Sequence, residues 1–299
     1  MRASVAAIGI FDGVHLGHQA ILKKAVARAR ALKAIPVAVT FYPHPLSVLN
    51  PARAPQLLML LPERLQALKA SGVRALRVVP FTRSFSRWSP ERFARQFLVN
   101  TLHVREVVVG HDFGFGAGRA GTPDTLRRLG AEHGFRVWVM PPVSKGGERI
   151  SSRRIREWIA QGNLAGAART MGRPPQVWGR VVRGAGRGRK LGFSTANVKP
   201  EGGILPPFGV YAVRAQLGRR GRSYIGMANY GRRPTFSGKE PVLEIHLFGL
   251  RRRLYGQRME LFFHRRLRGE RAFPSPEALA RQLGRDACRT KQVFALQRS

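Results

Sequence analysis

Residues 5–32 restrict the possible folds more than any other part of the chain. An apolar run, Val5–Ile10, is followed by a turn containing Asp12 and Gly13 and then by an amphipathic stretch, Gln19–Leu32. The run predicts a buried strand, and apolar residues at helical spacing predict a helix that covers it. The first half continues this alternation, with strands expected at 37–41, 75–80, 106–109 and 136–140 and helices at 62–71, 90–102 and 126–132. This order predicts an α/β domain built on a doubly wound parallel sheet.

The second half has a different pattern. After a helical stretch, Ser152–Met171, comes the sequence of residues 172–175, whose glycine and two prolines predict a linker. Short β-rich runs at regular spacing then predict an antiparallel barrel or sandwich, followed by a terminal helix over Ser275–Leu296. These runs are 176–183, 209–216, 223–229, 242–247 and 259–267. We therefore expect two domains, residues 1–172 and 176–299.

Composition limits the classes of function. The 299 residues with 43% hydrophobic content suffice for two cores, and the formal net charge is +37. This charge indicates either a biased composition with arginines on solvated faces or a nucleic-acid-binding protein. The first is favoured, because the arginines are scattered and aromatic residues do not interleave with them; nucleic acid would then bind only non-specifically. In both cases the field attracts anionic ligands such as nucleotides.

Cysteine content and hydropathy indicate the compartment. Cys288 is the only cysteine, so an intrachain disulfide and a thiolate metal cluster are excluded. Apolar runs fall short of the roughly 18 residues that span a bilayer, and the N-terminus lacks a secretory pattern. We expect a cytoplasmic protein, whose oligomeric state the sequence leaves open.

Two histidines follow the first expected strand. His15 and His18 form the His-x-Gly-His arrangement of nucleotidyltransferases, in which imidazoles donate hydrogen bonds to phosphate oxygens as charge builds on the α-phosphorus. Gly17 lets the triphosphate approach the backbone. The position at a strand-to-helix switch makes chance a poor account of the motif. The preceding residues that we assign to the nucleotide pocket are Gly9, Phe11 and Asp12.

Further polar segments follow other strands, at the edge where doubly wound sheets bind ligands. His44 stands between two prolines, and Asp112 and Phe113 lie in a glycine-rich loop. Residues 150–156 open a helix that offers hydroxyls, backbone N–H groups and guanidinium charge to a polyphosphate. The residues assigned there are Ser151, Ser152 and Arg156. Taken alone, His44 is more simply a structural loop residue and the serines an N-cap; together, the segments favour nucleotidyl transfer.

A second candidate site lies in the second half. A glycine-rich loop with Gly184, Gly186, Gly188 and Gly192 would let backbone amides surround a nucleotide diphosphate. The Thr195 hydroxyl and the Asn197 carbonyl are hard oxygen ligands suited to Mg²⁺. From the residues alone, the glycine–arginine run could equally be a basic loop, and Glu244 in its apolar strand could face solvent.

Several motifs spread over nearly the whole chain form one set. In the first half, Gly-x-Phe-Asp-Gly-Val-His-x-Gly-His, Thr-Phe-x-Pro-His-Pro, Val-Gly-x-Asp-Phe-x-Phe-Gly and Ile-Ser-Ser-Thr-x-Ile-Arg correspond to residues 9–18, 40–45, 109–116 and 150–156. In the second half, Leu-Gly-Phe-Pro-Thr-Ala-Asn, Pro-x-Gly-Val-Tyr, Ala-Asn-x-Gly-x-Arg-Pro-Thr-Phe and Leu-Glu-x-His-Leu correspond to residues 191–197, 207–211, 228–236 and 243–247. The set closely resembles that of the bacterial bifunctional riboflavin kinase/FAD synthetase family.

The resemblance implies a fold and two activities. It implies an N-terminal Rossmann-like nucleotidyltransferase domain and a C-terminal β-barrel riboflavin kinase domain with a terminal helix. The implied reactions are ATP-dependent phosphorylation of riboflavin to FMN, leaving ADP, and adenylylation of FMN by ATP to FAD with release of pyrophosphate, both with Mg²⁺. It makes His15 and His18 the catalytic groups of the second reaction and Glu244 the general base that deprotonates the ribityl 5′-hydroxyl in the first.

Three positions depart from the family pattern. Ser194 replaces the proline of Pro-Thr-Ala-Asn, which frees φ and lowers preorganisation. Gly249 and its neighbour stand where an acidic residue is expected after Leu-Glu-x-His-Leu. Arg153 replaces the threonine of Ser-Ser-Thr, and its guanidinium faces either the triphosphate or solvent. This last change leaves open the alternative of a kinase with a weakened or lost synthetase half.

Overall fold

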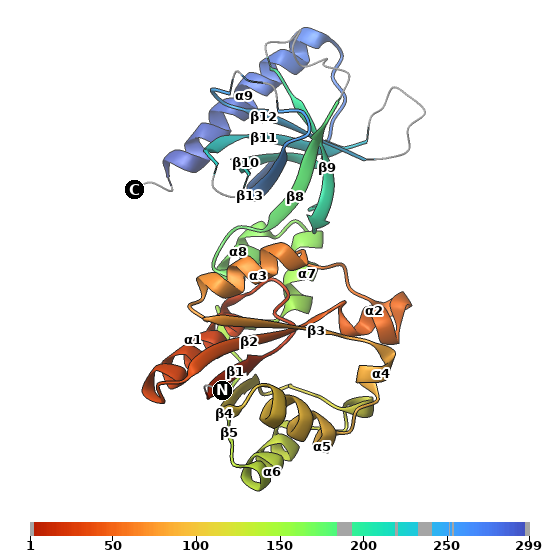
Figure 1. Cartoon of the computed structure of the whole chain (residues 1–299). Coiled ribbons are helices and arrows are strands. Elements are labelled where there is room, and N and C mark those ends of the chain that lie inside the picture. The colour runs from red at the N-terminus through yellow and green to blue at the C-terminus, as the bar shows by residue number, and fades with distance from the viewer. Residues whose placement is uncertain are drawn as a thin grey trace. The chain divides into compact units, whose positions relative to one another are not determined.

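The computed structural model describes residues 3–183, 193–218, 221–232, 241–250, 252 and 254–296. The chain forms two compact units, Met1–Ser152 and Arg153–Ser299, which Figure 1 shows as ribbons. The first unit is α/β and the second consists mainly of strands, as the change of sequence pattern predicts. The functional boundaries at residues 172 and 176 stay a prediction, because packing does not say which reaction a helix serves.

A parallel sheet forms the centre of the first unit. Its strand order is β3-β2-β1-β4-β5, and each neighbouring pair is parallel. The central strand is buried along its whole length, as expected for a sheet covered on both faces. The strands are β1 (Ser4–Ile8), β2 (Ile35–Tyr42), β3 (Ala75–Pro80), β4 (Val104–Gly110) and β5 (Arg136–Met140). The predicted doubly wound sheet is confirmed.

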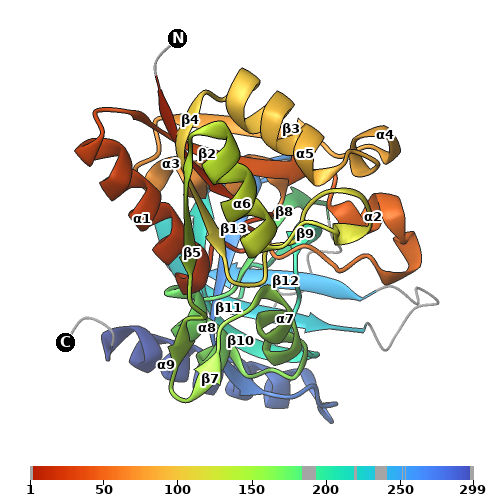
Figure 2. The ribbon, with the colours of Figure 1, turned by 90° about the horizontal axis from the view of Figure 1, so that it is seen from below.

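Helices cover both faces of this sheet. The longer ones are α1 (Leu16–Ala31), α3 (Leu61–Ala70), the π-helical η2 (Phe93–Thr101) and α6 (Pro123–His133). α3 lies on one side of the sheet and η2 and α6 on the other (Figure 1), and α1 contacts β1, β2 and β4 (Figure 2). Phe93 and Phe97 of η2 pack with Leu129 of α6 against Ile8 and Val109 of the strands.

Except for residues 90–92, which lie within an expected helix, the shorter elements were not predicted. The helix expected over residues 90–102 begins as a single α turn and continues as the π-helical η2. A two-stranded hairpin follows β5. The short elements are α2 (Pro45–Leu49), η1 (Pro51–Arg53), α4 (Arg83–Ser86), α5 (Pro90–Arg92), η3 (Ala117–Arg119), β6 (Ser144–Lys145) and β7 (Glu148–Arg149).

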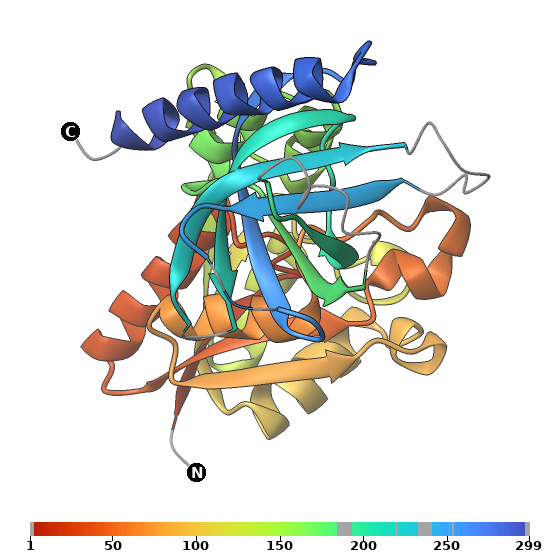
Figure 3. The same ribbon diagram turned by 90° about the horizontal axis from the view of Figure 1, so that it is seen from above.

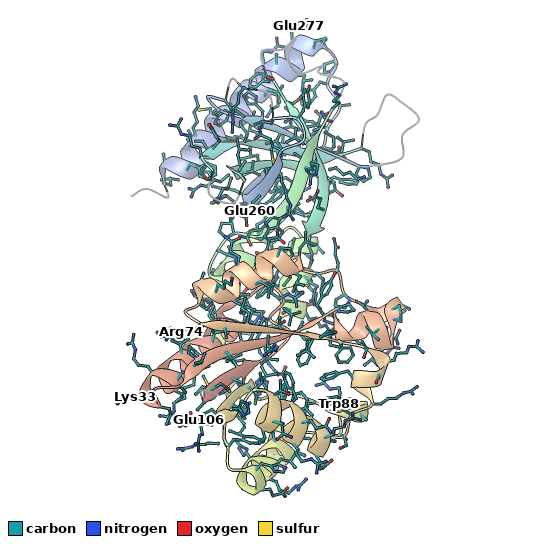
Figure 4. All side chains as sticks on the ribbon, in the orientation of Figure 1. Lys33, Arg74, Trp88, Glu106, Glu260 and Glu277 are labelled. Atoms are coloured by element: carbon teal, nitrogen blue, oxygen red, sulfur yellow. The ribbon has the colours of Figure 1, made fainter. Side chains whose placement is uncertain are left out.

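A buried carboxylate connects α1 with β4 and β5. Glu106, labelled in Figure 4, is 4% exposed and accepts hydrogen bonds from Arg28 Nε at 2.8 Å and Nη2 at 2.7 Å. It also accepts from Trp138 Nε1 at 2.7 Å. The hydrogen bond from Arg28 lowers the pKa of Glu106, against the opposing effect of burial. Lys24 and Arg136 lie over the Trp138 ring, 3.9 and 4.3 Å from its centroid, so positive charge covers the edge strand β5.

The second unit contains a closed barrel. Its described strands follow the order β10-β11-β12-β9-β8-β13, and neighbouring strands are antiparallel. Val213, Ile245 and Leu261 are among the apolar residues of its core. The strands are β8 (Gln176–Val182), β9 (Ala196–Gly203), β10 (Gly209–Leu217), β11 (Ser223–Gly231), β12 (Val242–Leu247) and β13 (Arg258–Arg268). The choice between barrel and sandwich, which the sequence left open, is thus resolved as a barrel.

The predicted terminal helix packs on this barrel. α9 (Pro276–Ala295) lies across it and contacts β10, β11 and β13 (Figure 3). Asp286 of α9 is fully buried and accepts hydrogen bonds from Arg268 Nε at 2.9 Å and from Gln282 Nε2 at 2.7 Å. A charge-assisted bond from β13 therefore fixes the helix in place.

Two helices replace the single one expected over residues 152–171. α7 (Ser152–Ala160) ends before Gly162, whose φ of +80° favours glycine, and α8 (Leu164–Met171) begins after Asn163. The Asn163 side chain caps α8 by accepting a hydrogen bond from Gly166 N–H at 2.9 Å. α8 contacts β13, and Leu164 belongs to the barrel core. The barrel therefore uses residues that precede the expected linker.

The substitution Glu106→Gln should lower the free energy of unfolding at neutral pH by roughly 1–3 kcal/mol, because Arg28 loses a buried charged acceptor. The lowered folded pKa means that the carboxylate's contribution is present above its ordinary pKa of 4.5 and is lost as the pH falls through the folded value. Urea unfolding at about pH 7 and about pH 3 measures this. The two proteins should differ more at the higher pH than at the lower. Glu132→Gln, which removes an exposed ion pair, is the control; an equal gap between E106Q and the parent at both pH values contradicts the assignment.

A fragment of residues 163–299 should be more stable than one of residues 176–299. The shorter fragment lacks α8 and the buried Leu164, and a void of this size in a core costs about 2–5 kcal/mol. Thermal unfolding of the two fragments tests the expectation. Equal midpoints would show that α8 is not part of the folding unit of the barrel.

Candidate active sites

The loop after β1 carries the two predicted histidines. It contains two non-glycine residues with left-handed backbone, Phe11 at φ +54° and Val14 at +39°, on either side of Gly13 at +86°. Such conformations are costly for bulky residues and persist only where surrounding contacts enforce them. A Cβ on Gly13 would lie 2.7 Å from Leu58 Cδ1, so the tight turn also requires glycine for space.

His15 is the N-cap of α1. Its Nδ1 accepts a hydrogen bond from the backbone N–H of His18 at 3.3 Å. Because Nδ1 is an acceptor, the proton of the neutral ring is on Nε2, which is thus a donor. A Cβ on Gly17 would lie 3.2 Å from the His15 ring, so glycine here leaves room for that ring beside the helix start.

The two imidazoles lie against each other. The rings of His15 and His18 stack with centroids 3.6 Å apart and planes 17° apart, and Phe11 meets His18 edge-on at 5.3 Å. A Cβ on Gly9 would lie 3.2 Å from the Phe11 ring, so glycine there makes room for this aromatic contact. The structure therefore gathers these predicted residues at the start of α1, where the helix dipole favours a negatively charged ligand.

Asp12 connects the histidine loop to the segment that precedes α3. The side chain is 2% exposed, and its oxygens accept the backbone N–H groups of Leu58 and Met59, both at 3.1 Å. Its carbonyl oxygen accepts a hydrogen bond from Ser152 Oγ at 2.9 Å, so the serine segment that the sequence placed at this site does lie beside the histidine loop. These contacts give Asp12 a structural role in holding the loop. Direct contact between Asp12 and a nucleotide stays a prediction.

Arg64 of α3 is a residue that the sequence analysis missed. It is fully buried, and its Nη1 donates to the carbonyl oxygens of Ile10 at 2.9 Å and Phe41 at 3.4 Å, which bridges the ends of β1 and β2. Burial lowers the pKa of Arg64, and nearby Asp12 acts in the opposite direction. One arginine in a helix of this arginine-rich chain carries no sequence signal of such burial.

The remaining predicted residues of this unit lie on neighbouring loops. His44 follows β2 after a cis Tyr42–Pro43 peptide, is 7% exposed and caps α2 by accepting Leu46 N–H at 3.2 Å. This capping favours the structural interpretation of His44. Asp112, after β4, has a side chain 75% exposed that lies 3.8 Å from Arg149. Phe113 stacks on Phe115 with centroids 5.5 Å apart.

Arg153 and Arg156 belong to the second compact unit. Arg153 Nε donates to Glu157 at 3.0 Å, and its side chain is 89% exposed. This pairing favours the solvent-facing interpretation of Arg153. A phosphate contact by Arg156, like one by Ser151, stays a prediction.

The kinase candidate residues meet on the barrel. Glu244 of β12 pairs in register with Asn197 of β9 on one side and with Asn229 of β11 on the other. The burial of β12 alternates, with Leu243, Ile245 and Leu247 in the core, so Glu244 faces outward in a row with both asparagines. Thr195 directly precedes β9. Asn229, which lies in one of the quoted motifs, was not singled out from the sequence. The predicted glycines Gly184, Gly186, Gly188 and Gly192 lie outside the described residues.

Family models match both halves of the chain. The FAD synthetase model matches residues 1–154 and the riboflavin kinase model residues 171–294. A protein of Escherichia coli (strain K12) named bifunctional riboflavin kinase/FMN adenylyltransferase is 38% identical over 292 residues, which cover 98% of this chain and 93% of that protein. The chain belongs to this family. The resemblance of the motifs is thereby confirmed across the whole length.

Other members of the bifunctional riboflavin kinase/FMN adenylyltransferase family are similarly close. Proteins of that name from Haemophilus influenzae and Pseudomonas fluorescens are each 37% identical over 295 residues, covering 98% of this chain and 95% and 94% of their own. A crystal structure described as a macrolide-efflux protein from Streptococcus pneumoniae has a TM-score of 0.84 and 30% identity, covering 95% of this chain and 92% of that one. In the described part of this chain, the helices are too short or too polar to cross a membrane.

Proposed function

We propose that the chain makes FAD in two steps. The barrel phosphorylates riboflavin with ATP to give FMN and ADP. The α/β unit transfers AMP from a second ATP onto FMN, releasing pyrophosphate. The observation that carries the proposal is the stacked histidine pair at the start of α1, together with the Asn197–Glu244–Asn229 row on the barrel. Incubation of the full chain with riboflavin, ATP and Mg²⁺, followed by chromatography, should yield FMN and then FAD.

Adenylyl transfer requires stabilisation of charge more than removal of a proton. The nucleophile is a phosphate oxygen of FMN, which is already ionised at neutral pH, and the leaving group is pyrophosphate. His15 donates from Nε2 to an oxygen of the triphosphate, and His18, stacked on it, acts on the same group. The dipole of α1 adds to this stabilisation of negative charge. Ser151, Ser152 and Arg156 hold the outer phosphates.

Phosphorylation of riboflavin requires a base. The ribityl 5′-hydroxyl is neutral and must lose its proton as it attacks the γ-phosphorus of ATP. Glu244 takes that proton, and its place between two asparagines keeps the carboxylate in a polar row on the outer face of β12. Asn197, whose side chain is 6% exposed at the head of β9, and Thr195 supply oxygen donors of the type that Mg²⁺ prefers. When bound there, Mg²⁺ neutralises charge on the phosphates.

The proposal also covers organisation and location. The synthetase domain is residues 1–172 and the kinase domain residues 176–299. α8 falls within the first of these ranges in sequence, but it packs on the barrel. Riboflavin, FMN, FAD and ATP or ADP are the partners, and the cytoplasm is the location, because both steps consume ATP. Nucleic acid binds at most non-specifically, through attraction to the net charge of +37.

The substitution His18→Ala should lower the rate of FAD formation from FMN by on the order of 10²–10³-fold, the usual effect of losing one donor to a developing oxyanion. FMN formation from riboflavin should not change. Rates of the two half-reactions, started separately from FMN and from riboflavin, measure both effects. His133→Ala, at the far end of α6, is the matched control. An H18A protein that forms FAD within a few-fold of the parent rate would remove His18 from the mechanism.

The substitution Glu244→Gln should abolish FMN formation while added FMN is still converted to FAD. Glutamine keeps the size of the side chain and one acceptor oxygen but cannot take up the hydroxyl proton. Glu277→Gln, an exposed change on α9 labelled in Figure 4, should leave both rates unchanged. Normal phosphorylation of riboflavin by E244Q would show that another group is the base.

A further inference from the structure

The barrel contains a histidine close to Glu244 that the proposed steps do not use. His246 lies two residues further along β12, so its side chain leaves the same face of the strand as Glu244. Its Nδ1 lies 2.9 Å from the carbonyl oxygen of Ser194. Since a carbonyl oxygen can only accept, Nδ1 carries the proton and donates it to Ser194.

Ring contacts support this hydrogen bond. Phe193 meets the His246 ring edge-on with centroids 5.1 Å apart, and Phe248 does so at 5.5 Å. His246 thus contacts two aromatic rings, one directly after its own strand and one on the segment to which it donates. Such edge-on aromatic contacts favour one orientation of the imidazole over others.

The contacted segment leads directly into the kinase site. The ladder between β9 and β12 ends at the pair Ala196–Ile245, so residues 193–195 lie beyond it and need other contacts for their position. Ser194 also stands where the family pattern has proline. Proline would fix φ near −65°, whereas serine leaves that angle free and adds conformational entropy that must be lost when the segment orders.

We propose that His246 is a positioning residue for riboflavin phosphorylation. Its hydrogen bond to the Ser194 carbonyl fixes the segment that presents Thr195 and Asn197. Because serine does not restrict φ as proline does, this chain depends on the hydrogen bond more than a chain with proline at position 194 would. The inference rests on the proposed kinase roles of Thr195 and Asn197. It predicts that His246 and residue 194 are energetically coupled.

Three substitutions separate the parts of this contact. His246→Phe keeps an aromatic ring between Phe193 and Phe248 but removes the donor. His246→Asn restores an N–H donor near the position of Nδ1. Ser194→Pro keeps the carbonyl acceptor and restricts the backbone, so it should reduce the need for the hydrogen bond. His264→Phe is the matched control, because it changes another barrel histidine, on β13, whose ring lies 4.6 Å from Phe294.

His246→Phe in the full chain should raise the KM for ATP in FMN formation by roughly three- to tenfold, the value of one hydrogen bond, with a smaller change in kcat. His246→Asn should restore most of the parent KM. In a Ser194→Pro background, His246→Phe should raise the KM by no more than about twofold. FAD formation from FMN by the same proteins is the internal control and should not change. The thermal midpoint should shift by no more than the loss of one hydrogen bond explains.

Several outcomes overturn the proposal. A parent-like KM for H246F, or the same increase with and without Ser194→Pro, shows that the hydrogen bond does not position the segment. If kcat falls, KM rises and the thermal midpoint falls to a similar extent in H246F, His246 is only a structural residue. If H246F does not fold, His246→Gln, which moves the donor away from the carbonyl, replaces it under the same criteria. An inactive E244Q with an unaffected H246F overturns only the role of His246, whereas an active E244Q overturns the proposed kinase site itself.

Discussion

The site in the α/β unit depends on the hydrogen bonds that the buried carboxylate of Asp12 accepts. By accepting two backbone N–H groups from Leu58 and Met59, it ties the histidine loop to the segment that enters α3. Arg64, from that helix, ties the ends of β1 and β2 to the same point and places its charge near Asp12. This network enforces the left-handed backbone at Phe11 and Val14. The imidazoles are therefore carried by a loop with fixed contacts. In the proposed mechanism this lets them stabilise charge without reorganisation.

The barrel achieves rigidity by a different route. Closure of the sheet leaves each described strand with a neighbour on both sides, so register is fixed all the way around. Glu244 receives its two asparagine neighbours from β9 and β11 as a direct consequence of that register. A slip of one residue in β12 would turn Glu244 into the core and expose Leu243. The position of Glu244 is thus fixed by the hydrophobic pattern of β12, in which Leu243, Ile245 and Leu247 fill the core.

Sequence alone predicted the elements with strong periodicity and the residues with motif signals. The parallel strands, α1, α3, α6 and α9 follow from apolar spacing, and the histidine pair follows from its position at a strand-to-helix switch. β9 was missed because Ala196–Gly203 carries a proline and two glycines and few β-branched residues, and only its neighbours in the barrel make it a strand. The π-helical geometry of η2 and the burial of Arg64 were missed for a related reason. Both depend on tertiary contacts that leave no local pattern.

The two sites differ because their nucleophiles differ. In adenylyl transfer the phosphate of FMN arrives already charged, so a carboxylate beside it would repel it and would have no proton to remove. Asp12, the acidic residue nearest the histidines in sequence, is accordingly buried with its oxygens on backbone N–H groups. In phosphorylation the ribityl hydroxyl arrives neutral, so a base is needed; the proposed base, Glu244, stands on the outer face of its strand. In a chain with 53 basic and 16 acidic residues, Asp12 is thus held by backbone donors and Glu244 stands in register with two neutral amides. On the proposed mechanism, this difference matches the protonation state in which each nucleophile arrives.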